Sequence, residues 1–118
     1  MSLSVAIATF NEEENIKRCM ESVKEIADEI IVVDGSSKDK TVEIAESYGA
    51  KVLVKDNPIM FHINKQKAID LANGDWILQL DADEFVSSSL SEEIKKITTM
   101  TDSEIEEYQK TIPELLKR

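Results

Sequence analysis

The chain alternates between short strand-like and helix-like segments along most of its length, and this order constrains the fold more than any other feature. Because the connections are short, strands joined through a helix are expected to run parallel with right-handed crossovers. The sequence therefore predicts the α/β class, with a mainly parallel sheet of about four strands and helices on both faces. Strands are expected at residues 3–9, 29–33, 51–54 and 76–80, and helices at 12–25, 39–48, 62–72 and 92–99, with a further helical segment from about residue 102.

Local signals mark where several of these helices begin and end. Asn11 stands three residues before Glu14, a spacing that resembles a capping box and predicts a helix start beside it. Gly49 follows the second helical segment and is expected to be its C-cap, because glycine adopts the left-handed conformation without strain. The serine-rich residues 87–91 are expected to form a loop and a helix cap. The inward stripe of the first helix is expected to consist of Ile16, Cys19, Met20 and Val23.

The length of 118 residues suits one domain, which we expect over residues 1–100, followed by a helical tail at 101–118. The longest apolar run, residues 30–33, is far shorter than the ~20 residues that span a bilayer, so no transmembrane segment is expected. The N-terminal residues lack the basic region of a signal peptide. The single cysteine, Cys19, excludes an internal disulfide and a cysteine-based zinc site and is expected in the core.

The charge balance narrows the classes of partner. Acidic residues outnumber basic ones by 24 to 14, which gives a net charge of -10. Such a chain is not expected to wrap a nucleic-acid backbone or to lie on an anionic membrane by charge alone. It can still bind a phosphate ester if a divalent cation lies between the like charges. The remaining question is whether carboxylates gather where a cation could bind.

Polar side chains follow three of the four predicted strands. Thr9 and Asn11 come at the end of the first strand, Asp34 at the end of the second, and Asp81 and Asp83 at the end of the fourth. The carboxyl ends of parallel strands meet at one edge of a sheet, and in Rossmann-like sheets ligands bind beyond that edge. The sequence therefore predicts that these residues form one site.

The sequence Asp81-Ala82-Asp83 is the main candidate for a metal ligand. Two carboxylates one residue apart offer the hard oxygen atoms that Mg²⁺ and Mn²⁺ prefer, with substrate phosphates and waters as further ligands. An isolated pair of this kind is more often a solvated turn, because aspartate is a common turn residue. Its position after a buried strand, with Asp34 at the same edge, favours the metal site.

The other polar residues at this edge each allow two interpretations. Asp34 could accept a hydrogen bond from a base or a ribose hydroxyl, or it could cap the following helix. Asn11 could cap a helix while the backbone beside it faces a base. Lys67 or Lys65 could help to neutralise a diphosphate, although each alone is more simply a solvated helix residue. His62 is the only histidine, so a nucleophilic triad is not supported.

Glycine-cradled phosphate binding is not expected, because the chain has three glycines and none forms a Gly-x-Gly-x-x-Gly or Walker motif. Three segments resemble a known family: VAIATFNEEE at residues 5–14, IVVDGSSKDKT at 31–41 and GDWILQLDADE at 74–84. Together and in this order they resemble the inverting family 2 glycosyltransferases, and most closely the group that includes bacterial lipopolysaccharide-core and cell-surface sugar transferases. The resemblance covers roughly residues 3–100 and implies the glycosyltransferase-A fold.

The resemblance also implies a ligand and a role for each matching residue. The ligand is a nucleotide-diphosphate sugar, often UDP-linked, bound with Mg²⁺ or Mn²⁺. Asp34 resembles the acid that contacts the base or ribose, Asp81 the acid on the ribose side and Asp83 the acid that binds the metal. Thr9, Asn11 and Glu12 resemble the segment along the base, and Lys67 loosely matches a basic residue near the nucleotide or its phosphates.

Members of the family usually exceed two hundred residues, and their second half supplies the acceptor pocket and the catalytic carboxylate. No residue of this chain is nominated as that base, although Glu84 would be the substitute if the chain were active alone. The expected function is therefore the donor-binding part of a glycosyltransferase that transfers a sugar to a hydroxyl acceptor. The protein is expected to act in the cytoplasm, with any peripheral membrane attachment supplied by other parts or partners, and its open sheet edge would allow a homo-oligomer.

Three alternatives remain beside this expectation. One is a binding module that holds a nucleotide or nucleotide-sugar without chemistry, being truncated or dependent on a partner chain. A second is a phosphatase of the haloacid-dehalogenase type, which carries its Asp-x-Asp on the first strand rather than the fourth. A third is a receiver-like signalling domain, for which Asp56 is a poor match to the phosphorylated aspartate.

Overall fold

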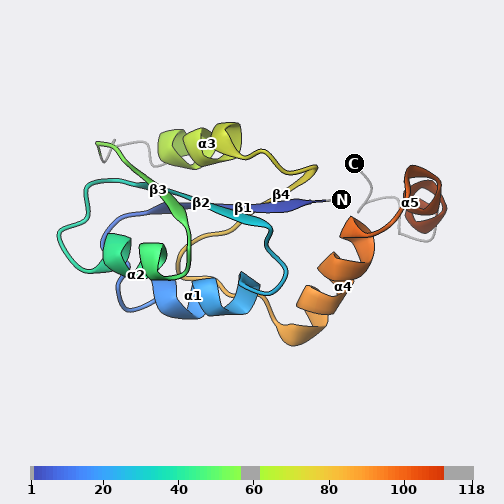
Figure 1. The fold of residues 1–118 in the computed structure, drawn as a ribbon, viewed down its shortest axis with the longest axis horizontal. Coiled ribbons are helices and arrows are strands. Elements are labelled where there is room, and N and C mark those ends of the chain that lie inside the picture. The colour runs from blue at the N-terminus through green and yellow to red at the C-terminus, as the bar shows by residue number, and fades with distance from the viewer. Residues whose placement is uncertain (1, 57–61, 111–118) are drawn as a thin grey trace.

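The centre of the molecule is a parallel sheet whose strands lie in the order β3-β2-β1-β4 (Figure 1). The structure is a computed structural model that describes residues 2–56 and 62–110. Within these residues the sheet has four strands, and every pairing is parallel, as predicted. The strands are β1 Leu3–Thr9, β2 Glu29–Asp34, β3 Lys51–Val54 and β4 Trp76–Gln79. The helices are α1 Ile16–Val23, α2 Thr41–Ser47, α3 His62–Leu71, α4 Ser88–Thr98 and α5 Asp102–Gln109.

Helices cover both faces of the sheet, as the alternating order predicts. Helix α3 packs on one face against β1, β2 and β4, while α1 and α2 lie side by side on the other face (Figure 1). Helix α4 contacts the end of this second layer through α1. The chain thus forms the α/β fold that a doubly covered parallel sheet requires.

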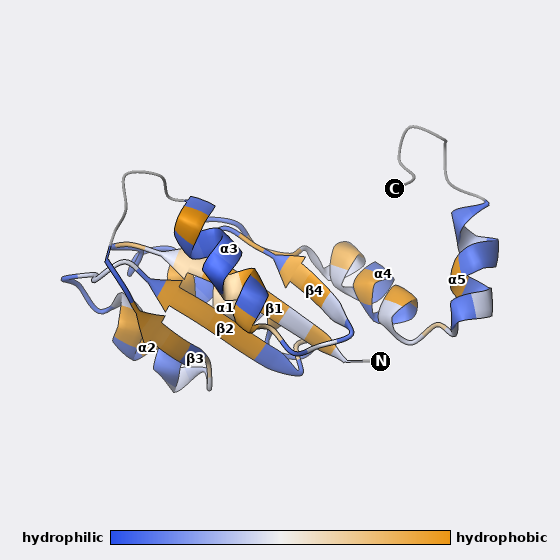
Figure 2. Ribbon diagram, turned by 90° about the horizontal axis from the view of Figure 1, so that it is seen from above, coloured by the Kyte–Doolittle hydropathy of each residue, from blue (hydrophilic) through white to orange (hydrophobic). Residues whose placement is uncertain are grey.

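The core is much larger on the α1 side of the sheet than on the α3 side. Strand β1 is buried along its whole length, and Figure 2 shows hydrophobic residues on the strands of the sheet. On the α3 side a small cluster surrounds Ala6 and Ala68. On the α1 side, alternate residues of β1 meet the predicted stripe of α1, so this prediction is confirmed. The buried residues there include Val5, Ile7, Ile16, Cys19, Met20 and Val23.

The predicted start of the first helix is wrong by several residues. Helix α1 begins at Ile16, and its N-cap Asn15 makes no side-chain capping bond within the described residues. Asn11 cannot form the expected capping box because its backbone has a φ of 53° and its side chain bonds to another loop. The Oδ1 atom of Asn11 accepts a hydrogen bond of 2.8 Å from the Lys38 backbone N–H. Contacts between loops therefore replace the local cap.

Other helix ends agree better with the sequence. Gly49 has a φ of 81° after α2, as expected for a C-cap glycine. Helix α4 begins at Ser88 rather than residue 92, because the Ser87 hydroxyl accepts a hydrogen bond of 3.2 Å from the Leu90 N–H. The serine-rich segment is thus a cap and the first turn of a helix. Helix α5 begins after a capping box between Thr101 and Glu104.

The division at residue 100 falls between α4 and α5, and residues 111–118 of the expected tail lie outside the described part of the chain. No residue of α5 itself is buried. Among the described residues, none of the helices is both long enough and apolar enough to span a bilayer.

Candidate functional site

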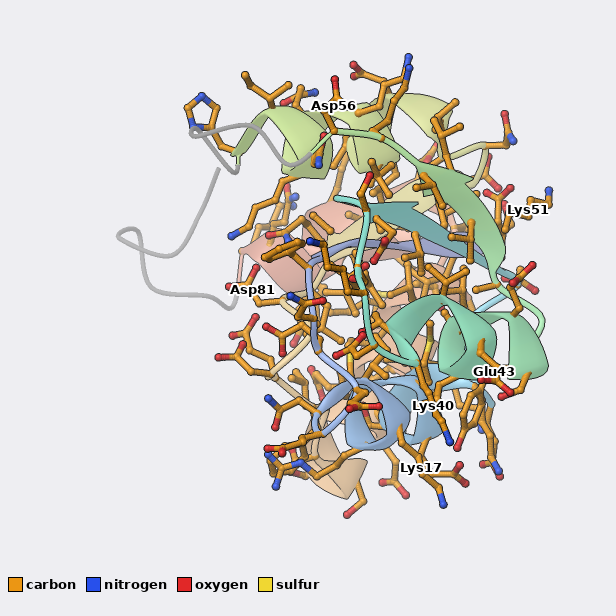
Figure 3. All side chains as sticks on the ribbon, turned by 90° about the vertical axis from the view of Figure 1, so that its left-hand side faces the viewer. Lys17, Lys40, Glu43, Lys51, Asp56 and Asp81 are labelled. Carbon is orange, nitrogen blue, oxygen red and sulfur yellow. The ribbon has the colours of Figure 1, made fainter. Side chains whose placement is uncertain are left out.

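The predicted polar residues do meet at the carboxyl edge of the sheet. Thr9 is the last residue of β1 and is the register partner of Asp34, the last residue of β2. Asp81 follows β4 on the other side of β1. Figure 3 looks onto this edge and shows Asp81 between α3 and α1. The strand order therefore brings together residues that the sequence separates widely.

The Asp34 carboxylate lies at the centre of one half of the site and is fully buried. Its Oδ1 atom accepts hydrogen bonds of 2.6 Å from the hydroxyls of Thr9 and Ser37. Its Oδ2 atom accepts a bond of 2.7 Å from the Ser37 N–H. Asp34 does not cap α2, whose N-cap is Lys40, and the Thr41 N–H at the start of that helix donates to Asp39 Oδ1 at 3.0 Å. Asp34 therefore holds the loop after β2, and its contact with a nucleoside stays a prediction.

The loops after β1 and β2 bind directly to one another. The Asn11 N–H donates to the Ser37 hydroxyl at 2.8 Å, and the Glu12 N–H donates to the Thr41 hydroxyl at 2.8 Å. Ser36 has a φ of 63°, which is strained for a residue with a side chain, and its hydroxyl bonds to the Lys55 carbonyl. Strained loop backbone held by surrounding bonds is common at ligand sites. The geometry makes these two loops one preorganised surface.

The other half of the site is the turn at residues 81–84. The Asp81 N–H donates to Glu84 Oε1 at 2.8 Å, and the Glu84 N–H donates to the Asp81 carbonyl at 2.9 Å. Ala82 points into the core and is buried. Glu84, the substitute candidate for a catalytic base, therefore uses its carboxylate to close the turn.

Asp81 is held by a lysine that the sequence could not single out. The Lys65 ammonium of α3 lies 2.8 Å from Asp81 Oδ1, and the Gln79 side chain donates to the same oxygen at 3.2 Å. These partners, Lys65 first, lower the pKa of Asp81 below its usual value. Lys67 instead lines a cavity of about 610 Å³ with Lys55, whose carbonyl accepts a hydrogen bond from the Ser36 hydroxyl of the β2 loop. Two residues along a helix turn the side chain to nearly the opposite side, so only one lysine of the pair reaches Asp81.

Asp83 is exposed and offers hard oxygen atoms at the rim of the site. Among the described residues, no group of three or more histidine, cysteine or acidic side chains could hold a metal ion. The other side chains near Asp83 are acidic as well. Burial, and then the carboxylates of Glu84, Asp83 and Asp81, together raise the pKa of the Cys19 thiol to about 12. Asp83 by itself offers only the hard oxygen atoms that divalent cations prefer, so water and phosphate oxygens would have to complete the shell of a cation there.

The family model of glycosyl transferase family 2 matches residues 4–107. The chain belongs to glycosyl transferase family 2. An uncharacterized glycosyltransferase from Rickettsia bellii is 50% identical to this family 2 domain over 96 residues, which are 80% of this chain and 32% of the relative. The chain therefore spans about a third of the length of that relative.

Solved structures support the same fold. The crystal structure of residues 1–349 of S. aureus TarS matches the family 2 domain with a TM-score of 0.69 and 25% sequence identity, over 81% of this chain and 32% of the other. The complex of TarS 1–349 with UDP matches with a TM-score of 0.63 and 25% identity, over 82% of this chain and 32% of the other. The predicted resemblance to glycosyltransferases of the GT-A fold is confirmed.

Proposed function

We propose that this family 2 domain binds a nucleotide-diphosphate sugar, UDP-linked, at the carboxyl edge of its sheet. In this proposal the domain is the donor-binding part of an enzyme that transfers the sugar to a hydroxyl acceptor. The observation that carries the proposal is the convergence of the linked β1 and β2 loops with the turn at residues 81–84 at one edge. The binding of UDP by TarS, a protein of similar fold, supports the choice of nucleotide.

The nucleoside is proposed to lie on the two linked loops, and the diphosphate beside the 81–84 turn. Thr9, Asn11, Glu12 and Asp34 form or support the surface for the base and ribose, and Asp81 lies on the ribose side. Lys65 supplies the positive charge that is already in contact with Asp81. Lys67, which lines the cavity of about 610 Å³, is proposed as a second basic contact for the nucleotide.

Asp83 is proposed to hold Mg²⁺ or Mn²⁺ together with the oxygens of the diphosphate. Bound there, the cation would neutralise the charge of the leaving nucleoside diphosphate. Without a cation, the carboxylates of the turn would repel the diphosphate, because like charges in a partly desolvated cleft cost free energy. The role of this chain is to present the carboxylate from a turn that its own core and Glu84 hold in place.

The acceptor and the catalytic base are proposed to belong to other parts of a longer protein or to a partner chain. The alternative, a binding module without chemistry, is favoured by one observation: an oxygen of the Glu84 carboxylate accepts the Asp81 N–H and so helps to close the turn. The sequence resemblance supports a role in the synthesis of a cell-surface polysaccharide. In this proposal the sugar is transferred in the cytoplasm, at the membrane. A homo-oligomer is proposed to form through β4, the strand at one edge of the sheet.

Calorimetric titration with UDP, GDP and their sugars, with and without Mn²⁺, tests the proposal. We expect UDP and a UDP-sugar to bind in the presence of Mn²⁺ and to bind much more weakly in excess chelator. Failure of every nucleotide to bind with Mn²⁺ would contradict the proposed function. Binding without turnover by a longer enzyme that contains this domain would favour the binding module.

The substitution Asp83→Asn tests the metal ligand. We expect the dissociation constant of UDP with Mn²⁺ to rise by at least about tenfold, which corresponds to ~1.4 kcal/mol, because a neutral amide is a weaker ligand for a divalent cation. The matched control is Asp102→Asn in α5, far from the carboxyl edge (Figure 1), which should leave the dissociation constant unchanged. Equal binding by wild type and Asp83→Asn would refute this assignment.

A further inference from the structure

Helix α1 contacts the turn after β4 through three neighbouring side chains. The Arg18 guanidinium carbon lies 4.4 Å from the centre of the Phe85 ring. The Cys19 thiol donates to the Asp81 carbonyl at 3.7 Å. The Ser22 hydroxyl accepts from the Val86 N–H at 2.9 Å. We call Arg18, Cys19 and Ser22 the α1 support.

The α1 support contacts both ends of residues 81–86, the segment that carries the candidate metal ligand Asp83. Cys19 contacts the first residue of the segment, and Ser22 contacts Val86, the last. The Ser22 hydroxyl also donates to the Cys19 carbonyl at 2.7 Å, which orients its oxygen toward the Val86 N–H. Ala82 and Val86 are buried in the core that α1 helps to form. Asp83 is thus the exposed part of a segment anchored on either side.

The contact between Arg18 and Phe85 is not explained by core packing alone. The Phe85 ring remains 52% exposed, and Arg18 itself lies at the surface. A cation over an aromatic face is attracted by the ring quadrupole, so the pair restrains the residues just after the acidic turn. Arg18 also places a positive charge on α1, close to the acidic turn. The carboxylates of Glu84, Asp83 and Asp81 in that turn help to raise the pKa of Cys19 on the same helix.

We propose that Arg18 and Ser22 are positioning residues for the donor site: by holding residues 81–86 against α1, they set the orientation of the Asp83 carboxylate. The proposal rests on the proposed function and deepens it. Ligand groups must be held within a fraction of an ångström to bind well, and partners that orient a metal ligand without touching the metal affect affinity strongly. Neither residue touches the nucleotide or the cation in this proposal.

The test compares Arg18→Ala and Ser22→Ala with wild type by calorimetric titration of UDP at saturating Mn²⁺. We expect the dissociation constant to rise about tenfold in each variant, the lower end of the range for such orienting partners. The conservative variants Arg18→Lys and Ser22→Thr retain the cation and the hydroxyl, so they should restore affinity to within about twofold of wild type. Unchanged affinity in both alanine variants would overturn the proposal.

The matched control is Lys17→Ala, which removes the same charge from α1 but lies on the side that points away from Asp81 (Figure 3). Its affinity for UDP should stay at the wild-type value, because the contact between Arg18 and Phe85 is kept. A tenfold loss in Lys17→Ala as well would show a general charge effect and contradict the role of Arg18.

Amide hydrogen exchange of residues 81–86 without ligand separates this proposal from the proposed function. Exchange should be faster in Arg18→Ala and Ser22→Ala than in wild type and Lys17→Ala, because the turn loses its restraint. Unchanged exchange overturns the positioning role whether or not UDP binds. Faster exchange in a protein that binds no nucleotide would support the restraint and contradict the donor site alone.

Discussion

Asp34 shows how one buried carboxylate can organise a binding surface. It is fully buried and accepts hydrogen bonds from Thr9 and Ser37, so the ends of β1 and β2 and the following loop share one anchor. A buried charge is tolerated only where hydrogen bonds replace its hydration. Asp34, which the sequence suggests as a ligand contact, therefore has a structural role in the folded chain.

Replacing Asp34 with asparagine should destabilise the domain. The amide cannot accept all three bonds with the strength of a carboxylate, and one of its atoms would be a donor facing other donors. We expect the free energy of unfolding in urea to fall by about 1.5–3 kcal/mol. The control Asp56→Asn, at the exposed end of the β3 segment, should change it by less than ~0.5 kcal/mol. An unchanged unfolding midpoint for Asp34→Asn would contradict the structural role.

Nucleoside binding by Asp34 is tested on the same variant under conditions where it is folded. Contact with the base or ribose predicts a further loss of UDP affinity of ~1–3 kcal/mol. A variant that loses stability but keeps its affinity would restrict Asp34 to the structural role.

At the scale of elements, a second carboxylate joins the strands at the opposite edge of the sheet. Glu29, the first residue of β2, accepts hydrogen bonds from the Ser4 hydroxyl at 2.6 Å and the Asn73 N–H at 2.9 Å. The Lys51 ammonium of β3 lies 3.1 Å from it. Glu29 therefore links β1, β2, β3 and the turn before β4, and these bonds, led by that of Ser4, lower its pKa to about 2.

The lowered pKa of Glu29 predicts a specific pH dependence. The folded chain holds Glu29 ionised more strongly than the unfolded chain, whose glutamates titrate near 4.5. The stabilisation is therefore complete above about pH 5 and is lost as the pH falls through 4.5 toward 2. We expect Glu29→Gln to unfold about 1.5–3 kcal/mol more easily at pH 7. Urea unfolding of both proteins at several pH values should show this difference shrinking on acidification, and a constant difference would exclude ionic stabilisation.

At the scale of the whole molecule, the sheet ends on one side at β4. The N–H groups of Trp76 and Leu80 point to β1, so those of Ile77 and Gln79 point outward, away from every described strand. Ile77 is 44% exposed on the face that α3 covers only in part. An edge strand with an exposed apolar residue is a template for association.

The chain is therefore expected to self-associate through β4. Sedimentation velocity should show a concentration-dependent dimer, and Ile77→Lys should weaken it by about tenfold or more, because a charged residue at a sheet edge opposes strand pairing. The control Ile63→Lys changes an isoleucine of α3 that is slightly more exposed than Ile77, and it should leave the dimer intact. A monomer at all concentrations would contradict the homo-oligomer.

The sequence alone determined the succession of strands and helices along the chain and the edge of the sheet at which the candidate site residues lie. Both follow from local patterns: apolar periodicity defines each element, and parallel strands must bring Thr9, Asp34 and Asp81 to the same edge. The start of α4 was misplaced by four residues because Ser87 and the serines after it suit both a loop and a helix cap.

Only the tertiary structure decided which partners these residues use. Asn11 bonds to the β2 loop instead of capping α1, because its backbone is left-handed and its side-chain Oδ1 accepts a hydrogen bond from the Lys38 N–H. Lys65 rather than Lys67 meets Asp81, because the packing of α3 on the sheet sets which side of the helix faces β4. The bonds of Arg18 and Ser22 to residues 85 and 86 likewise depend on how α1 lies under the turn. All of these contacts join residues far apart in the chain, so their geometry depends on the packing of helices against the sheet and leaves no periodic signal in the sequence.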